Sequence, residues 1–320
     1  MQTKLLLDPW SPDYEAPIQT GGPDMAATGE TDPSVETTVW KAIRSTAIIP
    51  FSRICFVDGV RRIEARVLAQ DENGRLIHGL FSSAGAGCVV NEGGQANFEG
   101  IDIRRYLILC AGRQKAESIP AGTQIIEFEG VSCAGDTQDE LMNSLQNLMR
   151  TGEAALGASL LRPGTCVFAD GPLNYFTSAT DALVGVIKRI FLPYLDAAHF
   201  ALVGQLAPGE RTPLFSIRDG KYDRYSWFQR LAKPRAMEHS LAGIIRLEVR
   251  AALGLQQASE IANFAAIRLP DFASTAVRDP RAPQNLVPVG ALEEQLRHRL
   301  GDSITIRRAI EKRIYEGVMI

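Results

Sequence analysis

The chain has 320 residues, of which 45% are hydrophobic and 22% charged, so it has enough apolar surface for one large packed domain or two ordinary ones. Its 34 basic and 37 acidic residues exclude a generally basic nucleic-acid coat, but not a nuclease that gathers acids at a metal site and bases along a groove. Short apolar runs and five cysteines without CxxC spacing argue against a membrane span, a secretion signal, a disulfide framework and a zinc site, so we expect a cytoplasmic protein with no membrane association.

Residues 1–38 are rich in Pro, Gly, Asp, Thr and Glu, and few of them are aliphatic. Because such a composition buries little apolar surface, we expect most of this segment to be an extended or mobile N-terminal arm. Leu5–Leu7 and Trp10 could still attach its start to the body of the protein or to a partner. Beyond the arm the composition becomes globular, and residues 39–320 are predicted to form one domain.

An antiparallel meander is predicted to open this domain. Residues 54–59 form an apolar run that ends in Asp58-Gly59, which is typical of a buried strand followed by a turn. Residues 61–69 alternate between polar and apolar positions, as a half-buried strand does. Residues 78–90 form a third strand region, and further short strands are expected at 107–110 and 124–128.

A long amphipathic helix is predicted over residues 136–157, and a Thr-x-x-Glu capping box marks its start. Glu153 lies on or beside the apolar face of this helix, where a carboxylate is unusual. Residues 165–171 follow as another buried strand, and this strand ends in Asp170-Gly171.

The rest of the chain alternates between helical and strand patterns. We expect, in chain order, a helix at 180–194, a short strand at 200–203, an antiparallel pair within 214–228, a strand at 243–249, and amphipathic helices at 289–300 and 304–315. Strands followed by alternating helices and strands indicate an α/β fold in which helices flank a mixed sheet.

Two predicted strands end alike, in Asp58-Gly59 and Asp170-Gly171, and the helix that carries Glu153 leads directly into the second strand. Active sites of such folds collect at strand ends, so these three acids could share a small volume. Their mutual repulsion would raise their pKa values, and a bound Mg²⁺ or Mn²⁺ would remove that penalty. If no metal binds there, each Asp-Gly is an ordinary turn, and this alternative stays open.

Other residues compete for a functional role. Asp279 could be a fourth acid of the site, although Asp-Pro also starts turns. Glu64, Glu127 and Glu129 alternate with apolar residues on predicted strands, so we expect them to face solvent. Trp227-Phe228 could stack on nucleic-acid bases, but a core aromatic pair is the more ordinary interpretation. The sequence contains no phosphate-loop, dinucleotide-binding, HExxH or GxSxG motif.

At these residues the chain resembles the NurA nuclease family, in its bacterial branch. The shared pieces are Phe-Val-Asp58-Gly, the Glu153 helix followed by Phe-Ala-Asp170-Gly-Pro-Leu, Gly-Val-Ile-Lys188, Gly-Ile-Ile-Arg246-Leu-Glu-Val, and Asp279-Pro-Arg281-Ala-Pro-Gln-Asn-Leu-Val-Pro. The resemblance implies a ribonuclease H-like core and a DNA nuclease that depends on two Mn²⁺ or Mg²⁺ ions. It also implies a homodimer that processes single- or double-stranded DNA ends together with a HerA-type hexameric ATPase.

The resemblance carries over to individual residues. It makes Asp58, Glu153 and Asp170 the catalytic and metal-binding carboxylates, and Asp279 is a candidate for the last metal ligand. It implies DNA contacts by Lys188, Arg246 and Arg281.

The sequence departs from the family pattern in two places. Val60 stands where the family usually has serine, and residues 279–292 lack the tyrosine and histidine of archaeal members. Either the last metal ligand is another residue, such as Asp279, or the site is weakened. The alternative hypothesis is therefore a non-catalytic, dimeric binding module with a ribonuclease H-like scaffold that docks on a ring ATPase. A small-molecule phosphoesterase fits less well, because a small phosphate needs few of the bases that follow Arg211.

Overall fold

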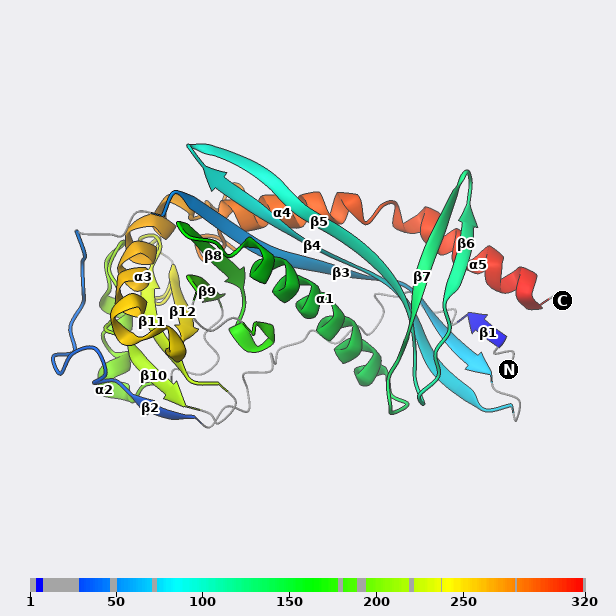
Figure 1. The fold of residues 1–320 in the computed structure, drawn as a ribbon, viewed down its shortest axis with the longest axis horizontal. Coiled ribbons are helices and arrows are strands. Elements are labelled where there is room, and N and C mark those ends of the chain that lie inside the picture. The colour runs from blue at the N-terminus through cyan, green and yellow to red at the C-terminus, as the bar shows by residue number, and fades with distance from the viewer. Residues whose placement is uncertain are drawn as a thin grey trace.

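The computed structural model of the chain describes residues 4–7, 29–46, 51–70, 74–177, 181–188, 194–218, 222–236, 238–279 and 281–318. These residues form an elongated molecule around one mixed sheet of 12 strands (Figure 1). The strands follow the order β2-β10-β11-β12-β9-β8-β3-β4-β5-β7-β6, with β1 paired to β3. The predicted α/β fold with a mixed sheet flanked by helices is therefore confirmed, while the ribonuclease H-like core stays a prediction.

The strands and helices have the following bounds. The strands are β1 (Lys4–Leu7), β2 (Glu30–Asp32), β3 (Arg53–Gln70), β4 (Leu76–Glu92), β5 (Gln95–Leu109), β6 (Glu117–Ala121), β7 (Gln124–Ser132), β8 (Thr165–Asp170), β9 (Leu183–Ile187), β10 (Phe215–Arg218), β11 (Arg224–Arg230) and β12 (Ile244–Arg250). The helices are α1 (Gln138–Leu160), α2 (Ala197–Phe200), α3 (Leu255–Arg268), α4 (Val287–Arg299) and α5 (Ser303–Val318). No helix in the described part of the chain is long and apolar enough to cross a membrane.

Strand β3 is a single strand of 18 residues rather than the two strands expected on either side of Asp58-Gly59. The predicted turn at this position is therefore wrong. Strand β4 pairs with β3 along its whole length, including Asp58 with Gly87 and Gly59 with Ala86. This continuous ladder of backbone hydrogen bonds overrides the local turn preference of an Asp-Gly sequence.

Two further sequence predictions differ from the structure. In place of the helix expected at 180–194, residues Leu183–Ile187 form β9, which runs parallel to β8 on one side and antiparallel to β12 on the other. A strand buried between two others is a continuous apolar run, which periodicity alone does not separate from a buried helix. The strand expected at 200–203 is wrong as well, because Asp196 caps the short helix α2 at this point.

The remaining predicted elements are found. Helix α1 corresponds to the predicted 136–157 helix, and Thr137 caps it by accepting a hydrogen bond from the backbone N–H of Glu140. The Glu140 carboxylate accepts from the backbone N–H of Gly135 rather than from that of Thr137, so the capping box is only half formed. Strand β8 ends at Asp170, and β10, β11 and β12 match the predicted antiparallel pair and the strand after it. Helices α4 and α5 match the two C-terminal helices.

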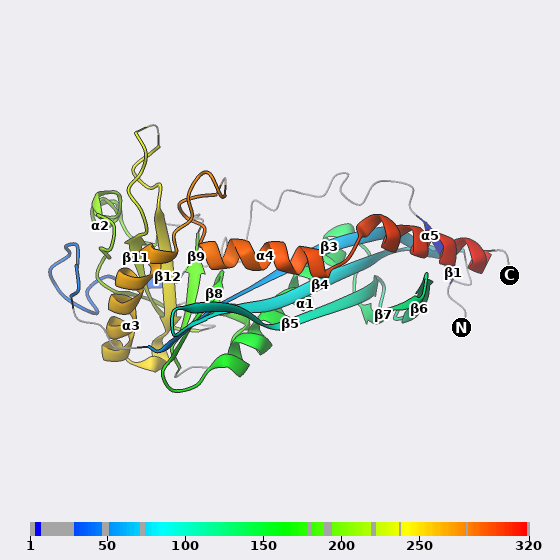
Figure 2. The same ribbon diagram turned by 90° about the horizontal axis from the view of Figure 1, so that it is seen from above.

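Helices cover both faces of the central strands (Figures 1 and 2). On one face, Phe56 and Phe168 pack in a core with Leu292 of α4. On the other face, Val57 and Val167 pack with α1. Helix α4 packs closely against β4 at Gly87. A Cβ atom added to Gly87 would lie only 3.0 Å from Leu292 Cδ1, so the absence of a side chain there allows the close approach.

Two pieces of the N-terminal 38 residues join the sheet. Strand β1 pairs with the end of β3, and β2 pairs with β10. Glu36 then anchors the chain by accepting hydrogen bonds of 2.7 and 2.8 Å from the guanidinium of the buried Arg211. Trp10 and the rest of residues 8–28 lie outside the described residues.

The close seat of α4 on β4 predicts a large effect of truncating Leu292. We expect Leu292→Ala to lower the free energy of unfolding by about 2–5 kcal/mol, because it opens a cavity at a fully buried position. Denaturant unfolding measures the change, and Ile304→Ala on the exposed face of α5 is the matched control. Equal effects of the two substitutions would contradict this packing.

The Glu36–Arg211 pair predicts a pH-dependent contribution to stability. Burial alone would raise the pKa of Glu36, but the hydrogen bonds and charge of Arg211 hold it below its ordinary value. As the pH falls, Glu36 is protonated in the unfolded chain before it is protonated in the folded protein. The pair therefore stabilises the folded protein at neutral pH, and this contribution is lost as the pH falls below about 4.3. We expect Glu36→Gln to cost about 3 kcal/mol at pH 7, because it leaves the buried Arg211 without a charged partner, and clearly less at pH 3.5. A cost that is the same at both pH values would contradict the assignment.

Candidate active site

Asp58 and Asp170 lie side by side on parallel strands. The register of β3 and β8 pairs Val57 with Ala169, and each aspartate is the next residue along its strand. Side chains alternate along a strand, so both aspartates share the face of Phe56 and Phe168, whose rings stack with centroids 5.6 Å apart. This is the face that α4 covers.

Asp170 ends its strand as the sequence predicts, whereas Asp58 lies within a strand. Gly171 follows with φ of 100°, a backbone conformation that glycine adopts readily and other residues rarely do. Strand β8 stops there while β3 continues beside β4. The two aspartates therefore lie next to each other where the short strand β8 ends beside the longer strand β3.

Glu153 approaches β3 from the opposite face. It projects from α1 and is only 3% exposed. A Cβ placed on Gly59 would lie 2.5 Å from Glu153 Oε1 and 3.0 Å from the backbone oxygen of Gly85. The glycine after Asp58 thus serves to admit this carboxylate to the backbone of β3 rather than to turn the chain.

Two basic side chains contact the three acids. Arg150 Nη1 donates hydrogen bonds to Glu153 Oε2 at 2.7 Å and to the backbone oxygen of Asp170 at 2.6 Å. Lys188, directly after β9, forms an ion pair with Asp170 in which Nζ lies 2.8 Å from Oδ1. The resemblance gave Lys188 a contact with the DNA backbone, which remains a prediction, and it gave no role to Arg150, although Arg150 precedes Glu153 by one helical turn.

Burial and like charge raise the pKa values of two of the acids. Burial raises the pKa of Asp58 well above its ordinary range, Asp170 and Glu153 raise it further, and Lys188 opposes them. Burial also raises the pKa of Glu153 to about 7, against the lowering effect of Arg150. Asp58 Oδ2 and Glu153 Oε1 are both buried and make no well-formed hydrogen bond among the described residues, although the Gly59 N–H lies close enough to Glu153 to lower its pKa. Such orphaned oxygens are costly, and they mark a place where a cation would be favourable.

A fourth acid, Glu293, borders the site from α4. It is buried, and its charge adds to the raised pKa of Asp58. Sequence reasoning missed it, although Glu293 lies four residues after the buried Val289, the same kind of signal that singled out Glu153. Its carboxylate accepts hydrogen bonds of 2.7 and 2.8 Å from Arg281.

Asp279 belongs to the same network as Glu293. It accepts hydrogen bonds from the Arg281 guanidinium and from Asn285 Nδ2, and Arg281 more than any other group holds its pKa well below the ordinary range. Both of its carboxylate oxygens are thus engaged. The roles predicted for Asp279 in metal binding and for Arg281 in DNA binding remain predictions.

Arg246 lies on the other face of the sheet from the two aspartates. Leu247 belongs to the core beneath α4, so the preceding residue points the opposite way. Arg246 is 2% exposed, bonds Glu248 Oε2 at 2.8 Å and lies over the ring of Tyr194. Its predicted contact with DNA remains a prediction.

The other competing residues are placed clearly. Trp227 and Phe228 are fully buried, as expected for a core pair. Glu127 and Glu129 are exposed as predicted. The prediction for Glu64 is wrong, because it is buried and bonded to neighbouring arginine and serine side chains.

The donor set fits a divalent metal in chemistry but not in its present arrangement. All three carboxylates offer hard oxygen ligands of the kind that Mg²⁺ and Mn²⁺ prefer, and two of their oxygens are orphaned. Within the described ranges, however, no three or more His, Cys, Asp or Glu side chains are grouped so as to hold a metal ion. Glu153 reaches β3 from the opposite face, and Lys188 holds Asp170.

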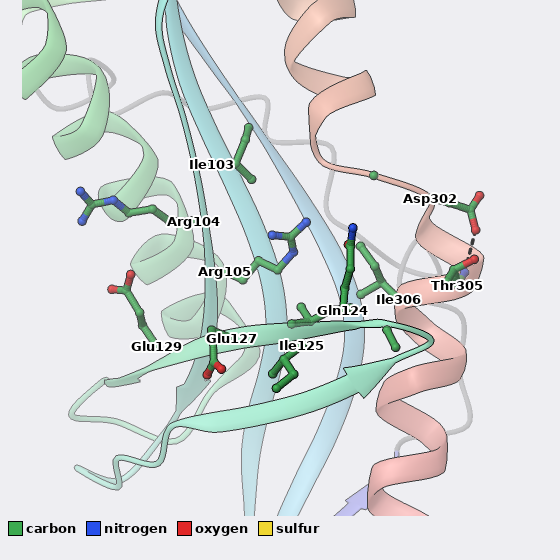
Figure 3. A pocket seen from close by; sticks show the side chains of 13 residues that line it. Ile103, Arg104, Arg105, Gln124, Ile125, Glu127, Glu129, Asp302, Thr305 and Ile306 are labelled. Carbon is green, nitrogen blue, oxygen red and sulfur yellow. Dashed lines mark hydrogen bonds between the residues drawn. The ribbon is translucent and has the colours of Figure 1, made fainter.

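A surface pocket of about 490 Å³ lies elsewhere, between β5, the β6–β7 hairpin and the junction of α4 and α5 (Figure 3). Its polar side chains are largely engaged: Arg105 donates to the backbone oxygen of Leu300, and Asp302 accepts from the backbone N–H of Thr305. Asp58, Glu153 and Asp170 are not part of its lining. The pocket therefore adds nothing to the chemistry of the acids.

Comparisons with known proteins give a likeness in structure and none in sequence. No family model matches the sequence, and no curated protein matches it either. Among solved structures, the NurA nuclease from Sulfolobus solfataricus is similar, with 11% sequence identity, coverage of 87% of this chain and 88% of that chain, and a TM-score of 0.48. A likeness of this degree assigns neither a family nor an activity.

The contact between Gly59 and Glu153 predicts a steric test of the site. We expect Gly59→Ala to lower the free energy of unfolding by about 1–3 kcal/mol, because the added methyl overpacks against the Glu153 carboxylate. The matched control is Gly152→Ala, whose Cβ would meet only Ala86 at 3.9 Å and whose helix propensity improves.

A double-mutant cycle with Glu153→Ala isolates this contact. Removing the carboxylate should abolish most of the cost of Gly59→Ala, which denaturant unfolding of the four proteins measures. An equal cost with and without Glu153 would show that the carboxylate does not occupy this position.

Proposed function

We propose that this protein is a metal-dependent DNA nuclease that hydrolyses phosphodiester bonds. The observation that carries the proposal is the pairing of Asp58 with Asp170 on adjacent strands, with Glu153 packed against β3 from its other face, and with buried oxygens of Asp58 and Glu153 lacking a hydrogen-bond partner among the described residues. Three carboxylates face two basic side chains there, and burial of this acidic cluster raises the pKa values of Asp58 and Glu153. A structural turn or a surface charge cluster would have no need to bury carboxylates.

Each residue of the site has a distinct part in this proposal. Asp58, Asp170 and Glu153 would hold Mn²⁺ or Mg²⁺, most simply as the two ions that the sequence resemblance implies. When bound, such ions supply an activated water and stabilise the leaving oxygen of a phosphodiester. Arg150 orients Glu153 through its 2.7 Å hydrogen bond, and Lys188 offers a positive charge to a phosphate at the open end of β8.

The identity of the substrate and partners rests on the sequence resemblance to NurA nucleases. It supports DNA ends as the substrate, a homodimer as the working unit, and a role in end processing or double-strand break repair beside a HerA-type hexameric ATPase. The alternative, a non-catalytic binding module, predicts DNA or partner binding that does not respond to divalent metal.

The first test is digestion of labelled single- and double-stranded DNA with Mn²⁺, Mg²⁺ or EDTA. We expect cleavage with Mn²⁺ that EDTA abolishes, and a loss of at least about 100-fold in rate for Asp58→Asn, because a missing ligand removes charge stabilisation worth several kcal/mol. Glu127→Gln on the exposed β7 is the matched control and should cleave like the unmodified protein.

Unfolding curves show whether each variant is folded. If the folded protein and Asp58→Asn cleave equally, the nuclease proposal fails at this site. If no cleavage occurs, the assay is repeated with a HerA-type ATPase, and DNA binding without cleavage in that mixture would favour the binding module.

A further inference from the structure

Lys188 neutralises the aspartates of the site from directly after β9. Val186 pairs with Asp170 across β8 and β9, and two residues later the Lys188 side chain reaches back to Asp170 Oδ1 at 2.8 Å. The side chain is 16% exposed, and its Nζ atom is shielded from solvent. Its charge also opposes the raised pKa of Asp58. One ammonium group therefore serves both aspartates.

This position conflicts with metal binding by Asp170. A Mg²⁺-sized ion binds a carboxylate oxygen at about 2.0–2.1 Å, and an ammonium held against the same oxygen would repel it. Arg150 is different, because it bonds the far oxygen of Glu153 and the backbone oxygen of Asp170, and it leaves Glu153 Oε1 available. Of the two basic residues, only Lys188 stands in the way of a cation.

We propose that Lys188 is a substrate-sensitive latch, which holds Asp170 until a DNA phosphate draws its ammonium group away and makes Asp170 available to a divalent cation. The proposal rests on the proposed nuclease function and deepens it. A lysine ammonium pairs readily with phosphate, and its flexible stem allows the exchange of partners. The positive charge is moved from the site to the substrate rather than lost.

The latch requires that DNA and metal bind cooperatively. Any factor by which DNA raises the affinity for Mn²⁺ must equal the factor by which Mn²⁺ raises the affinity for DNA. The latch would also keep the metal site from assembling fully when no DNA is present. Lys188 is thus a positioning residue in this proposal, since it acts through Asp170.

The test measures Mn²⁺ affinity directly, by calorimetry or by the paramagnetic resonance signal of free Mn²⁺, with and without a duplex carrying phosphorothioate linkages that resist cleavage. The proteins are the full chain, Lys188→Met, Lys188→Arg and the control Lys312→Met, which alters an exposed lysine of α5. We expect DNA to tighten Mn²⁺ binding by about 10-fold or more in the unmodified chain and in the control.

Lys188→Met should bind Mn²⁺ without DNA about 10-fold more tightly than the unmodified chain, and DNA should then add less than about 3-fold. Lys188→Arg keeps the positive charge, so it should retain the weaker binding and the response to DNA. This pair of variants separates the charge of residue 188 from any general disturbance of the fold.

The latch is overturned if Lys188→Met binds Mn²⁺ no more tightly than the unmodified chain, or if DNA leaves the affinity of the unmodified chain unchanged. Failure of the underlying nuclease proposal is a different result. In that case Mn²⁺ binding would be absent from every protein, or would be unaffected by Asp58→Asn.

Discussion

The continuous pairing of β3 with β4 around Asp58, from Arg53 to Ile63, is the constraint on which the candidate site depends. It keeps Asp58 and Gly59 in extended backbone, where consecutive residues must face opposite sides of the sheet. Asp58 therefore joins Asp170 beneath α4, and Gly59 leaves room for Glu153 on the side of α1. A turn at this point would separate the aspartate from its neighbour on β8 and would remove the backbone against which Glu153 packs.

Buried charge is the second constraint. In two places, buried carboxylates are paired with basic side chains. Arg150 and Lys188 contact the acids around Asp58, while Arg281 bridges Asp279 and Glu293 nearby. The two clusters differ in which carboxylate oxygens have hydrogen-bond partners. Glu293 bonds Arg281 through both oxygens, whereas one oxygen each of Asp58 and Glu153 has no partner among the described residues. Unpartnered carboxylate oxygens, rather than the number of acids, are what favour the cluster around Asp58 as the proposed cation site.

Local patterns identified part of the site and missed part of it for definite reasons. Glu153 was found because a carboxylate on the apolar stripe of a helix is rare, and Glu293 satisfies the same criterion on α4. Glu64 was predicted to be exposed because alternation of polar and apolar residues on a strand normally separates a solvent-exposed face from a buried one. Glu64 instead lies where the register of β3 and β4 shifts, between Ile63 and Ala65, so the simple alternation does not hold there, and Glu64 is paired with Arg62 and Ser83.

Local periodicity predicted most of the helices and strands, because the repeats of these elements depend on neighbours only a few residues away. The same patterns singled out Asp58, Glu153 and Asp170, whose catalytic roles remain predictions. They also placed Asp170 at the end of a strand. Only the tertiary structure decided that β3 runs through Asp58, that residues 183–187 form a strand, and that Lys188 rests on Asp170. These features depend on the register between strands far apart in the chain, and pairing across a sheet can override any local preference.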